Sequence, residues 1–429
     1  MSVLAVLGVV SVLLWLGIVV HPARPWDFLP VGDDGEIPPP PPQWPPVTIF
    51  IPARNESASL PHTLPALLAQ DYPGPFAVVV IDDRSDDDTA AVAKQIAAQA
   101  QITTRLTVID GAPLPQGWVG KVWALEQGAA YCGLPSPELS AITNSDNQRL
   151  SDNLQSAICL PPPSGGNPQY LLLTDADIRH APGSLRRLVA ESEHARLVLN
   201  SRMARLRCLS AAERLLIPPF VFFFNLLYPM RQVNNPRSGV AAAAGGCVLL
   251  ATAALRRAGG FACIKDRIID DVSLAKAVKG NDTPIQLALS RTEVESLRVY
   301  DALVKVWVMV RRTAFTELRH SWLRLTGTVV GMGLLFFIPP FLTVWGIMGW
   351  LMGAGGPATT ACVSPLFLML SGSSAWTLAA LVYRPAVRFF GLSSARMWTL
   401  PVAGLLYGAM TIDSAWRYAT GRRIGWRDR

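Results

Sequence analysis

Cysteine and histidine are scarce in this chain, which has six cysteines and five histidines in 429 residues. No two cysteines form a CxxC pair, and none lies at zinc-finger spacing from a histidine, so the sequence excludes a zinc-finger module. The pattern favours free thiols in a reducing compartment. Basic runs interleaved with aromatic residues, which bind RNA, are also absent, so we expect no nucleic-acid partner despite the net charge of +7.

Basic residues are missing in front of the first long apolar run, "VLAVLGVVSVLLWLGIVV" at residues 3–20. The run also lacks a small-x-small cleavage site, so it predicts an uncleaved transmembrane anchor over residues 1–22 rather than a signal peptide. His21 and Arg24 follow the run, and the positive-inside rule then places the rest of the chain in the cytoplasm. Residues 23–46 contain "IPPPPPQWPP", which predicts a stiff linker that holds a domain away from the membrane.

Strand-like and helix-like patterns alternate from Val47 onward. We expect strands at "VTIFIPA" (47–53), "FAVVVID" (76–82) and "RLTVID" (105–110), and helices at 59–70, 88–99 and 121–131. This alternation predicts a parallel sheet in an α/β domain, with ligands bound at the carboxyl ends of its strands. Residues 132–169, which are rich in Pro, Ser, Asn and Gly, interrupt the pattern and are interpreted as a mobile surface insertion.

Long apolar runs return in the C-terminal part of the chain, residues 321–429, in agreement with a mean hydropathy of +0.30. Thr328–Met352 and Ala358–Tyr383 are each long enough to span a bilayer. A shorter run, Trp398–Ile412, is flanked by basic clusters in a way that leaves open whether it crosses the membrane. The run at 215–230 contains prolines and is interpreted either as a pair of core helices or as an interfacial segment.

Two carboxylates, Asp175 and Asp177, follow the strand-like run "LLLT". Residues i and i+2 of an extended chain point to the same side, so both carboxylates can face one site at the end of the strand. Two carboxylates in close proximity repel each other unless a cation lies beside them. Because Mg²⁺ is typically held by one or two carboxylates together with substrate phosphates, the pair predicts a metal-bound diphosphate.

Polar residues also follow the other predicted strands. Arg54, Asn55 and Glu56 come after the first strand, and Asp82 and Asp83 end the second. Carboxylate and amide oxygens at these strand ends can accept hydrogen bonds from a uracil ring and a ribose. Helix N-capping and turn formation are the alternative interpretation for the neighbouring Ser57 and Asp86 to Asp88.

Two predicted helices begin with charged residues. Lys121 opens the helix in "GKVWALEQG", where its ammonium group and the helix N-terminus could face an anion. Asp270 and Asp271 open the helix in "IDDVSLA", where a carboxylate could act as a general base on a hydroxyl group. Helix capping is the alternative role of the aspartate pair.

Taken in order, "PARNE", "VIDDRSDDDT", "GKVWALEQG", "TDADI", "AAGGCVLL" and "IDDVSLA" resemble the family 2 glycosyltransferases of the GT-A fold, over residues 47–320. Within the family, the chain is most similar to the membrane glycosyltransferases associated with hopanoid biosynthesis, and more distantly to the ceramide glucosyltransferases. The resemblance implies an α/β, Rossmann-like GT-A domain between an N-terminal anchor and C-terminal transmembrane helices. It implies a multi-pass enzyme of the bacterial inner membrane, with a cytoplasmic catalytic domain.

The resemblance also implies the partners and the site. The donor would be a nucleotide-sugar, most simply a UDP-sugar, the acceptor a lipid hydroxyl, and the cofactor Mg²⁺ or Mn²⁺ held by Asp175 and Asp177. Asp271 would be the base, with Asp270 where the family usually has Glu, and Gly245 and Gly246 would line the acceptor side. The donor-binding residues would be Arg54, Glu56, Asp82, Asp83, Lys121, Asp175 and Arg319.

The chain departs from the family in the Gln-x-x-Arg-Trp motif that follows the base in membrane members. The matching stretch, "FTELRHSW", keeps Arg319 but has Thr316 and His320 in place of Gln and Trp. This departure argues against a processive polymer synthase. Two alternatives remain: a glycosyltransferase for a polysaccharide or a polyprenyl phosphate, and a membrane scaffold with a non-catalytic GT-A domain.

Overall fold

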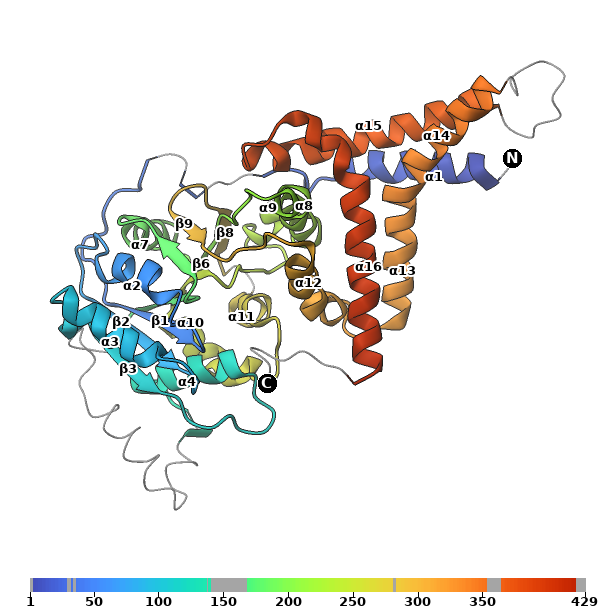
Figure 1. The fold of residues 1–429 in the computed structure, drawn as a ribbon. Coiled ribbons are helices and arrows are strands. Elements are labelled where there is room, and N and C mark those ends of the chain that lie inside the picture. The colour runs from blue at the N-terminus through green and yellow to red at the C-terminus, as the bar shows by residue number, and fades with distance from the viewer. Residues whose placement is uncertain are drawn as a thin grey trace. The chain divides into compact units, whose positions relative to one another are not determined.

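The computed structural model describes residues 3–28, 32–33, 36–136, 138–139, 168–280, 283–352 and 364–421. The chain forms two compact units (Figure 1). Of the described residues, 3–28, 208–231, 300–352 and 364–421 belong to the helical unit, and those within 32–207 and 232–299 belong to the α/β unit. Residues 208–231 and 300–320 pack within the helical unit, and the domain bounds expected from the sequence stay a prediction.

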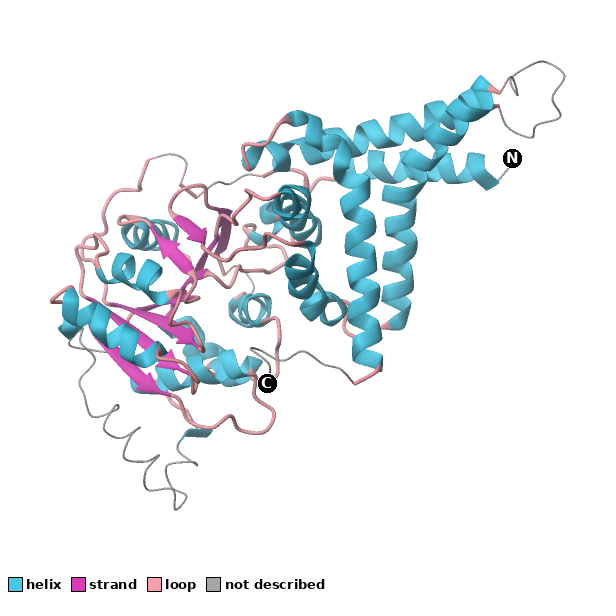
Figure 2. Cartoon of the chain, in the orientation of Figure 1, coloured by secondary structure: helices cyan, strands magenta, loops and turns pink. Residues whose placement is uncertain are grey.

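The α/β unit is built on a seven-stranded sheet with the strand order β3-β2-β1-β4-β7-β6-β8. Figure 2 shows the strands of this unit in magenta among the helices that surround them. Its strands are β1 (Val47–Ala53), β2 (Phe76–Asp82), β3 (Leu106–Asp110), β4 (Tyr170–Thr174), β6 (Leu199–Met203), β7 (Cys247–Ala251) and β8 (Ile285–Leu289). The predicted bounds of β1 and β2 are confirmed. All seven residues of β1 are buried, which explains why an unbroken apolar run marked this strand so clearly.

The sheet is parallel except at β7, which pairs antiparallel with both β4 and β6. An antiparallel strand needs no crossover helix, so the strand-helix alternation could not reveal it. The reversal has a consequence for the site. Thr174 at the carboxyl end of β4 pairs with Cys247 at the start of β7, so the residues just before β7 lie at the edge where β4 ends.

Helices cover both faces of the sheet. One face packs against α2 (Leu60–Leu68), α3 (Thr89–Gln99) and α7 (Ser184–Ala195) in the main hydrophobic core. On the other face, α4 (Gly120–Tyr131) brings Gly128 against Phe50 and Ile81. The unit is completed by α10 (Thr252–Ala258), α11 (Asp270–Val278) and a two-stranded sheet of β5 (Ile178–His180) and β9 (Val294–Ser296). Most of the predicted insertion at 132–169 lies outside the described residues.

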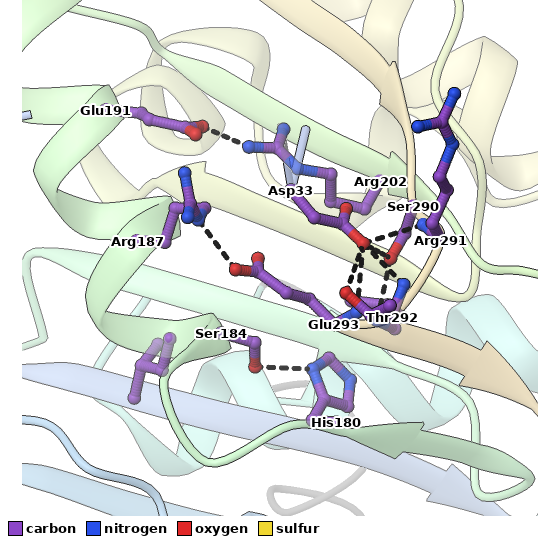
Figure 3. Close-up of polar contacts among 12 residues, drawn as sticks. Asp33, His180, Ser184, Arg187, Glu191, Arg202, Ser290, Arg291, Thr292 and Glu293 are labelled. Atoms are coloured by element: carbon purple, nitrogen blue, oxygen red, sulfur yellow. Dashed lines mark hydrogen bonds and ion pairs between the residues drawn. The ribbon is translucent and has the colours of Figure 1, made fainter. Parts of the chain in front are cut away.

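The described residues of the predicted linker pack against neighbouring residues. Trp26 donates a hydrogen bond to the Val19 carbonyl within the helical unit. In the α/β unit, one carboxylate oxygen of Asp33 accepts hydrogen bonds from the backbone N–H groups of Arg291, Thr292 and Glu293 (Figure 3). Three consecutive N–H groups of a turn form a natural anion-binding concavity, which Asp33 fills.

The helical unit holds α1 (Val3–Val20), α8 (Ala211–Leu227), α12 (Leu303–Glu317), α13 (Trp322–Met332), α14 (Ile338–Leu351), α15 (Pro365–Phe389) and α16 (Leu400–Ala419). A short π-helical turn at Gly333–Phe337 joins α13 to α14, and α9 (Met230–Val233) follows α8. By length and composition, three described helical segments could cross a membrane: Val3–Val20, Trp322–Leu351 and Pro365–Phe389. The apolar ends predicted from the sequence are therefore present as helices.

Two segments that the sequence left open form helices in the helical unit. Most of the run at 215–230 lies in α8, which continues as one helix through Pro218 and Pro219. The run is therefore not a pair of helices separated at its prolines. The run at 398–412 lies largely in α16, which is not among the three candidate spans. Asp413 of α16 lies 3.6 Å from Arg311 and accepts a hydrogen bond from Trp307, both of α12, which gives α16 a polar end.

Candidate active site

The ends of three neighbouring strands form one edge of the α/β unit. Because β2, β1 and β4 are adjacent and parallel, the residues that follow them gather at the same edge. Each strand contributes acidic residues there: Glu56 after β1, Asp82 and Asp83 at the end of β2, and Asp175 and Asp177 after β4. The sequence-predicted residues of these three segments thus lie along one edge.

Lys121 links this edge to the two helices that begin beside it. Its ammonium nitrogen lies 2.8 Å from Asp175 Oδ1 and 3.2 Å from Asp270 Oδ2. The neighbouring carboxylates, Asp175 foremost, raise the pKa of Lys121 in spite of its burial, so the group stays charged. Lys121 therefore joins Asp175 after β4 to Asp270 at the start of α11.

Asp271 lies beside this pair and is held by the backbone. Its carboxylate accepts hydrogen bonds from the N–H groups of Gly245 (2.8 Å) and Val272 (2.7 Å). Burial and the neighbouring Asp270 carboxylate raise the pKa of Asp271 to about 7. A carboxylate with a pKa near neutrality is a better proton acceptor at neutral pH than an ordinary aspartate.

Gly245 and Gly246 border the same place, just before β7. A Cβ atom at Gly245 would lie 3.2 Å from Lys121 Nζ and 3.3 Å from Asp271 Oδ2, so a side chain there would press on both charged groups. A Cβ atom at Gly246 would lie 3.1 Å from Ile178. Gly245 thus leaves room next to Asp271 of α11, whereas Gly246 faces Ile178 of β5.

Asp177 has a partner that the sequence did not suggest. Arg298, two residues beyond β9, places its Nε 3.2 Å from Asp177 Oδ2. The N–H of Leu297 also donates to the Asp177 carbonyl at 2.9 Å. Burial and the Asp175 carboxylate raise the pKa of Asp177. Arg298 was missed because only the pairing of β5 with β9 brings it to this edge, and no local pattern marks that pairing.

The pair of carboxylates after β4 fits a divalent cation. Asp175 and Asp177 are close enough for one to raise the pKa of the other, and a cation placed beside them would relieve this repulsion. Carboxylate oxygens are the ligands that Mg²⁺ and Mn²⁺ prefer. Over the described part of the chain, no three His, Cys, Asp or Glu side chains gather as a ready-made metal cage. The pair therefore suits a cation that completes its coordination with water or phosphate oxygens.

The residues after β1 and β2 are tied together by short-range contacts. Arg54 NH1 lies 3.6 Å from Asp83 Oδ2, and Asp83 is fully buried. The Glu56 carboxylate accepts from the Ser59 hydroxyl at 2.7 Å, and Asp82 accepts from the Ser85 N–H at 3.0 Å. Of these acids, only Asp82 is not buried.

Arg319 belongs to the helical unit, where it lies in the turn between α12 and α13 with a positive φ of 52°. Its predicted contact with a diphosphate stays a prediction.

Comparison with known proteins decides the family. The sequence model described as "Glycosyltransferase like family 2" matches residues 45–324. The chain belongs to this family. The match runs from β1 to the first residues of α13 and so includes every acidic residue of the site edge.

Two further similarities refine the picture of this family 2 glycosyltransferase. A mannosyltransferase from Pyrobaculum calidifontis, solved in complex with GDP-Man and Mn²⁺, has a TM-score of 0.53 and 16% identity, covering 96% of this chain and 99% of that one. This likeness supports the GT-A fold. The 4,4'-diaponeurosporenoate glycosyltransferase of Staphylococcus aureus (strain MRSA252) is 37% identical over 86 residues, or 20% of each chain. The glycosyltransferase thus matches about a fifth of that relative's length.

Proposed function

We propose that this family 2 glycosyltransferase moves a sugar from a nucleotide-sugar to the hydroxyl group of a membrane lipid, with inversion at the anomeric carbon. One observation carries the proposal. Asp271, whose pKa is raised to about 7, is held by the Gly245 N–H beside the Lys121 ammonium that also pairs with Asp175. Lys121 thereby lies between the proposed proton acceptor, Asp271, and the predicted diphosphate site at Asp175.

The donor would bind along the strand-end edge. Arg54, Glu56 and Asp82 follow β1 and β2, where a nucleoside is bound in open α/β sheets. Asp83 is fully buried, and in this proposal it holds Arg54 in place. We assign a uridine nucleotide on the basis of the motif resemblance alone.

Asp175 and Asp177 would hold Mg²⁺ or Mn²⁺, which, when bound, takes up negative charge on the leaving diphosphate. Lys121 and Arg298 already pair with these two carboxylates, so they keep them oriented toward the site. Both cations also add positive charge where the nucleoside diphosphate would depart.

Transfer itself requires one bond to form and one to break. The acceptor oxygen bonds to the anomeric carbon while that carbon's bond to the diphosphate oxygen breaks, and the nucleoside diphosphate leaves with the bonding electrons. Asp271 takes the proton of the acceptor hydroxyl as general base, an effect worth about 10²- to 10⁴-fold in rate. A single displacement of this kind inverts the configuration of the sugar.

A lipid acceptor is supported by the apolar helices. Three described helical segments are long and apolar enough to cross a membrane, and a lipid hydroxyl lies at the bilayer surface. The Staphylococcus aureus relative is a 4,4'-diaponeurosporenoate glycosyltransferase, which supports a lipid-related acceptor here as well. A hopanoid acceptor rests on the motif resemblance, and the cytoplasmic orientation at a bacterial inner membrane rests on the charges that flank the apolar runs.

The test is a transfer assay with the full chain in membranes. Radiolabelled UDP-sugars would be incubated with total bacterial lipid, and label would be counted in the organic and aqueous phases. We expect label in the organic phase, bound to a neutral lipid. Label in aqueous polymer or on a polyprenyl phosphate would favour the alternative transferases. Equal lipid labelling by the wild type and Asp271→Asn, or complementation of a deletion by that variant, would favour the non-catalytic scaffold.

A further inference from the structure

Lys279 lies in a ring of backbone carbonyl groups. It follows the last residue of α11, and its ammonium nitrogen lies 2.6 Å from the carbonyl oxygen of Val240, 2.8 Å from that of Val233 and 3.1 Å from that of Asn235. The Gln232 carbonyl oxygen lies 3.4 Å away. An ammonium group has only three N–H donors, so these oxygens satisfy it completely. Such a ring resembles the oxygen cage of a bound cation, with the lysine in the cation's place.

All of these carbonyl groups belong to one segment, residues 232–240, which leads directly to the site. Five residues beyond Val240, the N–H of Gly245 donates to the Asp271 carboxylate at 2.8 Å. The segment is fixed to the sheet at two further points. The Asn234 side chain donates to and accepts from the backbone of Leu287 in β8, and the Ala244 N–H donates to the Ser201 hydroxyl.

The same helix, α11, therefore contacts this segment at both of its ends. Asp271 is the second residue of the helix and Lys279 follows its last residue, eight positions later. At 1.5 Å per residue, the two contacts are separated by about 12 Å along the helix axis. One contact holds the proposed base, and the other fixes the segment that supplies the N–H group to that base.

We propose that Lys279 is a positioning residue, which holds residues 232–246 against α11 so that the Gly245 N–H stays on the Asp271 carboxylate. The inference rests on the proposed role of Asp271 as the base. Without the ammonium group, the Val233 and Val240 carbonyl oxygens would lose their donor, whereas those of Gln232 and Asn235 would keep backbone N–H donors. Loss of these two contacts costs free energy and loosens the segment. The Gly245–Asp271 bond would then open more often. A base displaced by about 1 Å can lose on the order of 100-fold in rate.

The first experiment measures the segment itself and needs no transferase activity. Hydrogen–deuterium exchange of the full chain in detergent would follow the peptide that covers residues 240–247 in the wild type, Lys279→Ala and Lys276→Ala. Lys276 is a matched control, because it lies on the same helix with an exposed side chain. We expect faster exchange in Lys279→Ala only. Unchanged exchange in that variant would overturn the proposal.

The second experiment tests whether a small cation can replace the missing ammonium group in Lys279→Ala. Methylammonium carries the donor group of the missing side chain, whereas tetramethylammonium has the same charge without an N–H group. We expect methylammonium, but not tetramethylammonium, to restore slow exchange to Lys279→Ala in a saturable manner. Rescue by both ions, or by neither, would contradict a ring that requires N–H donors.

The third experiment measures how the carbonyl ring around Lys279 affects the rate of sugar transfer. In the transfer assay we expect kcat of Lys279→Ala to fall about 10- to 100-fold and to recover with methylammonium, while the KM for the nucleotide-sugar changes less than twofold. Fast exchange with an unchanged kcat would overturn the positioning role. A wild type without any transfer would overturn the proposed function instead and leave the exchange results standing.

A conservative variant guards against loss of the fold. Lys279→Arg keeps a cation in the ring, but its planar guanidinium cannot direct its donors as an ammonium group does. We expect exchange and kcat between those of the wild type and Lys279→Ala. Wild-type values for both would show that the ring does not require the donor geometry of an ammonium group, which contradicts the proposed role of Lys279.

Discussion

The two halves of the active-site edge differ in how their charges are arranged. In the nucleotide half, formed by Arg54, Glu56, Asp82 and Asp83, each acid contacts a neighbour from its own or the adjacent loop. In the catalytic half, formed by Lys121, Asp175, Asp177, Asp270, Asp271 and Arg298, four carboxylates lie beside two cations. Acids outnumber cations by two in each half, but only in the catalytic half do carboxylates lie close enough to one another for Asp175 to raise the pKa of Asp177 and for Asp270 to raise that of Asp271.

This difference separates residues that hold the fold from residues kept ready for chemistry. The pKa of Asp177 and the pKa of Asp271 are both raised by burial and by a neighbouring carboxylate. Uncompensated negative charge of this kind lowers the stability of the unliganded protein and attracts a cation or a proton. The four predictions below test the contrast, from the largest expected effect on turnover to the smallest.

Removal of the base charge should have the largest effect. Asp271→Asn keeps the size of the side chain but cannot accept a proton, so we expect kcat to fall by about 10²- to 10⁴-fold. Steady-state kinetics with a nucleotide-sugar and lipid would measure the change. Asp266→Asn is the matched control, because Asp266 precedes α11 with a 64% exposed side chain. A fall in kcat of less than threefold in Asp271→Asn would show that Asp271 is not the general base.

The pH dependence of the rate should reveal the same group. The pKa of Asp271 is raised, so its proton-accepting form is present above about pH 7 and is lost as the pH falls. We therefore expect log(kcat/KM) to be flat above pH 7 and to fall by about one unit per pH unit below it. The residual activity of Asp271→Asn should lack this slope. A wild-type profile that is flat between pH 5 and 8 would contradict the assignment.

A methyl group at Gly245 should disturb the catalytic half alone. Its Cβ would lie 3.2 Å from Lys121 Nζ and 3.3 Å from Asp271 Oδ2, so both charged groups must shift. We expect Gly245→Ala to lower kcat about tenfold, because small misplacements of reacting groups are costly. Gly239→Ala is the control, since nothing lies within 4 Å of a Cβ atom there. Equal activity of both variants would show that Gly245 does not limit the site.

A change in the nucleotide half should appear in stability more than in turnover. Asp83 is fully buried beside Arg54, so Asp83→Asn removes the partner of a mostly buried guanidinium. We expect the free energy of unfolding in urea to fall by about 1–3 kcal/mol, with kcat lowered less than threefold. The exposed Asp86 provides the control variant Asp86→Asn. A larger loss of kcat than of stability would assign Asp83 a direct part in the reaction.

Much of this edge could be predicted from the sequence because its acids follow parallel strands. The strands β1 and β2 are unbroken apolar runs, and Asp175 and Asp177 follow one such run directly. The contacts that could not be predicted are long-range ones. Arg298 reaches Asp177 through the pairing of β5 with β9, and Lys279 reaches Val240 through the course of a loop.

The long apolar helices of the helical unit could be predicted from the sequence, but the continuation of α8 through its prolines could not. The apolar runs gave the helices α1, α14 and α15, since length and hydropathy depend on no distant contact. The single helix through Pro218 and Pro219 was not expected, because proline usually breaks a helix. There the Tyr407 hydroxyl donates to the Leu216 carbonyl at 2.8 Å, a contact between residues 191 positions apart that no local pattern reveals.

The most direct test of the closely spaced carboxylates in the catalytic half is a Mn²⁺ titration followed by electron paramagnetic resonance. We predict one Mn²⁺ per chain, bound at least tenfold more tightly when UDP is present, because phosphate oxygens complete the coordination. The double variant Asp175→Asn/Asp177→Asn should lose this binding, while Asp86→Asn should retain it. If the double variant binds Mn²⁺ as tightly as the wild type, or if the wild type binds none with UDP present, the catalytic half is not a site for a divalent cation.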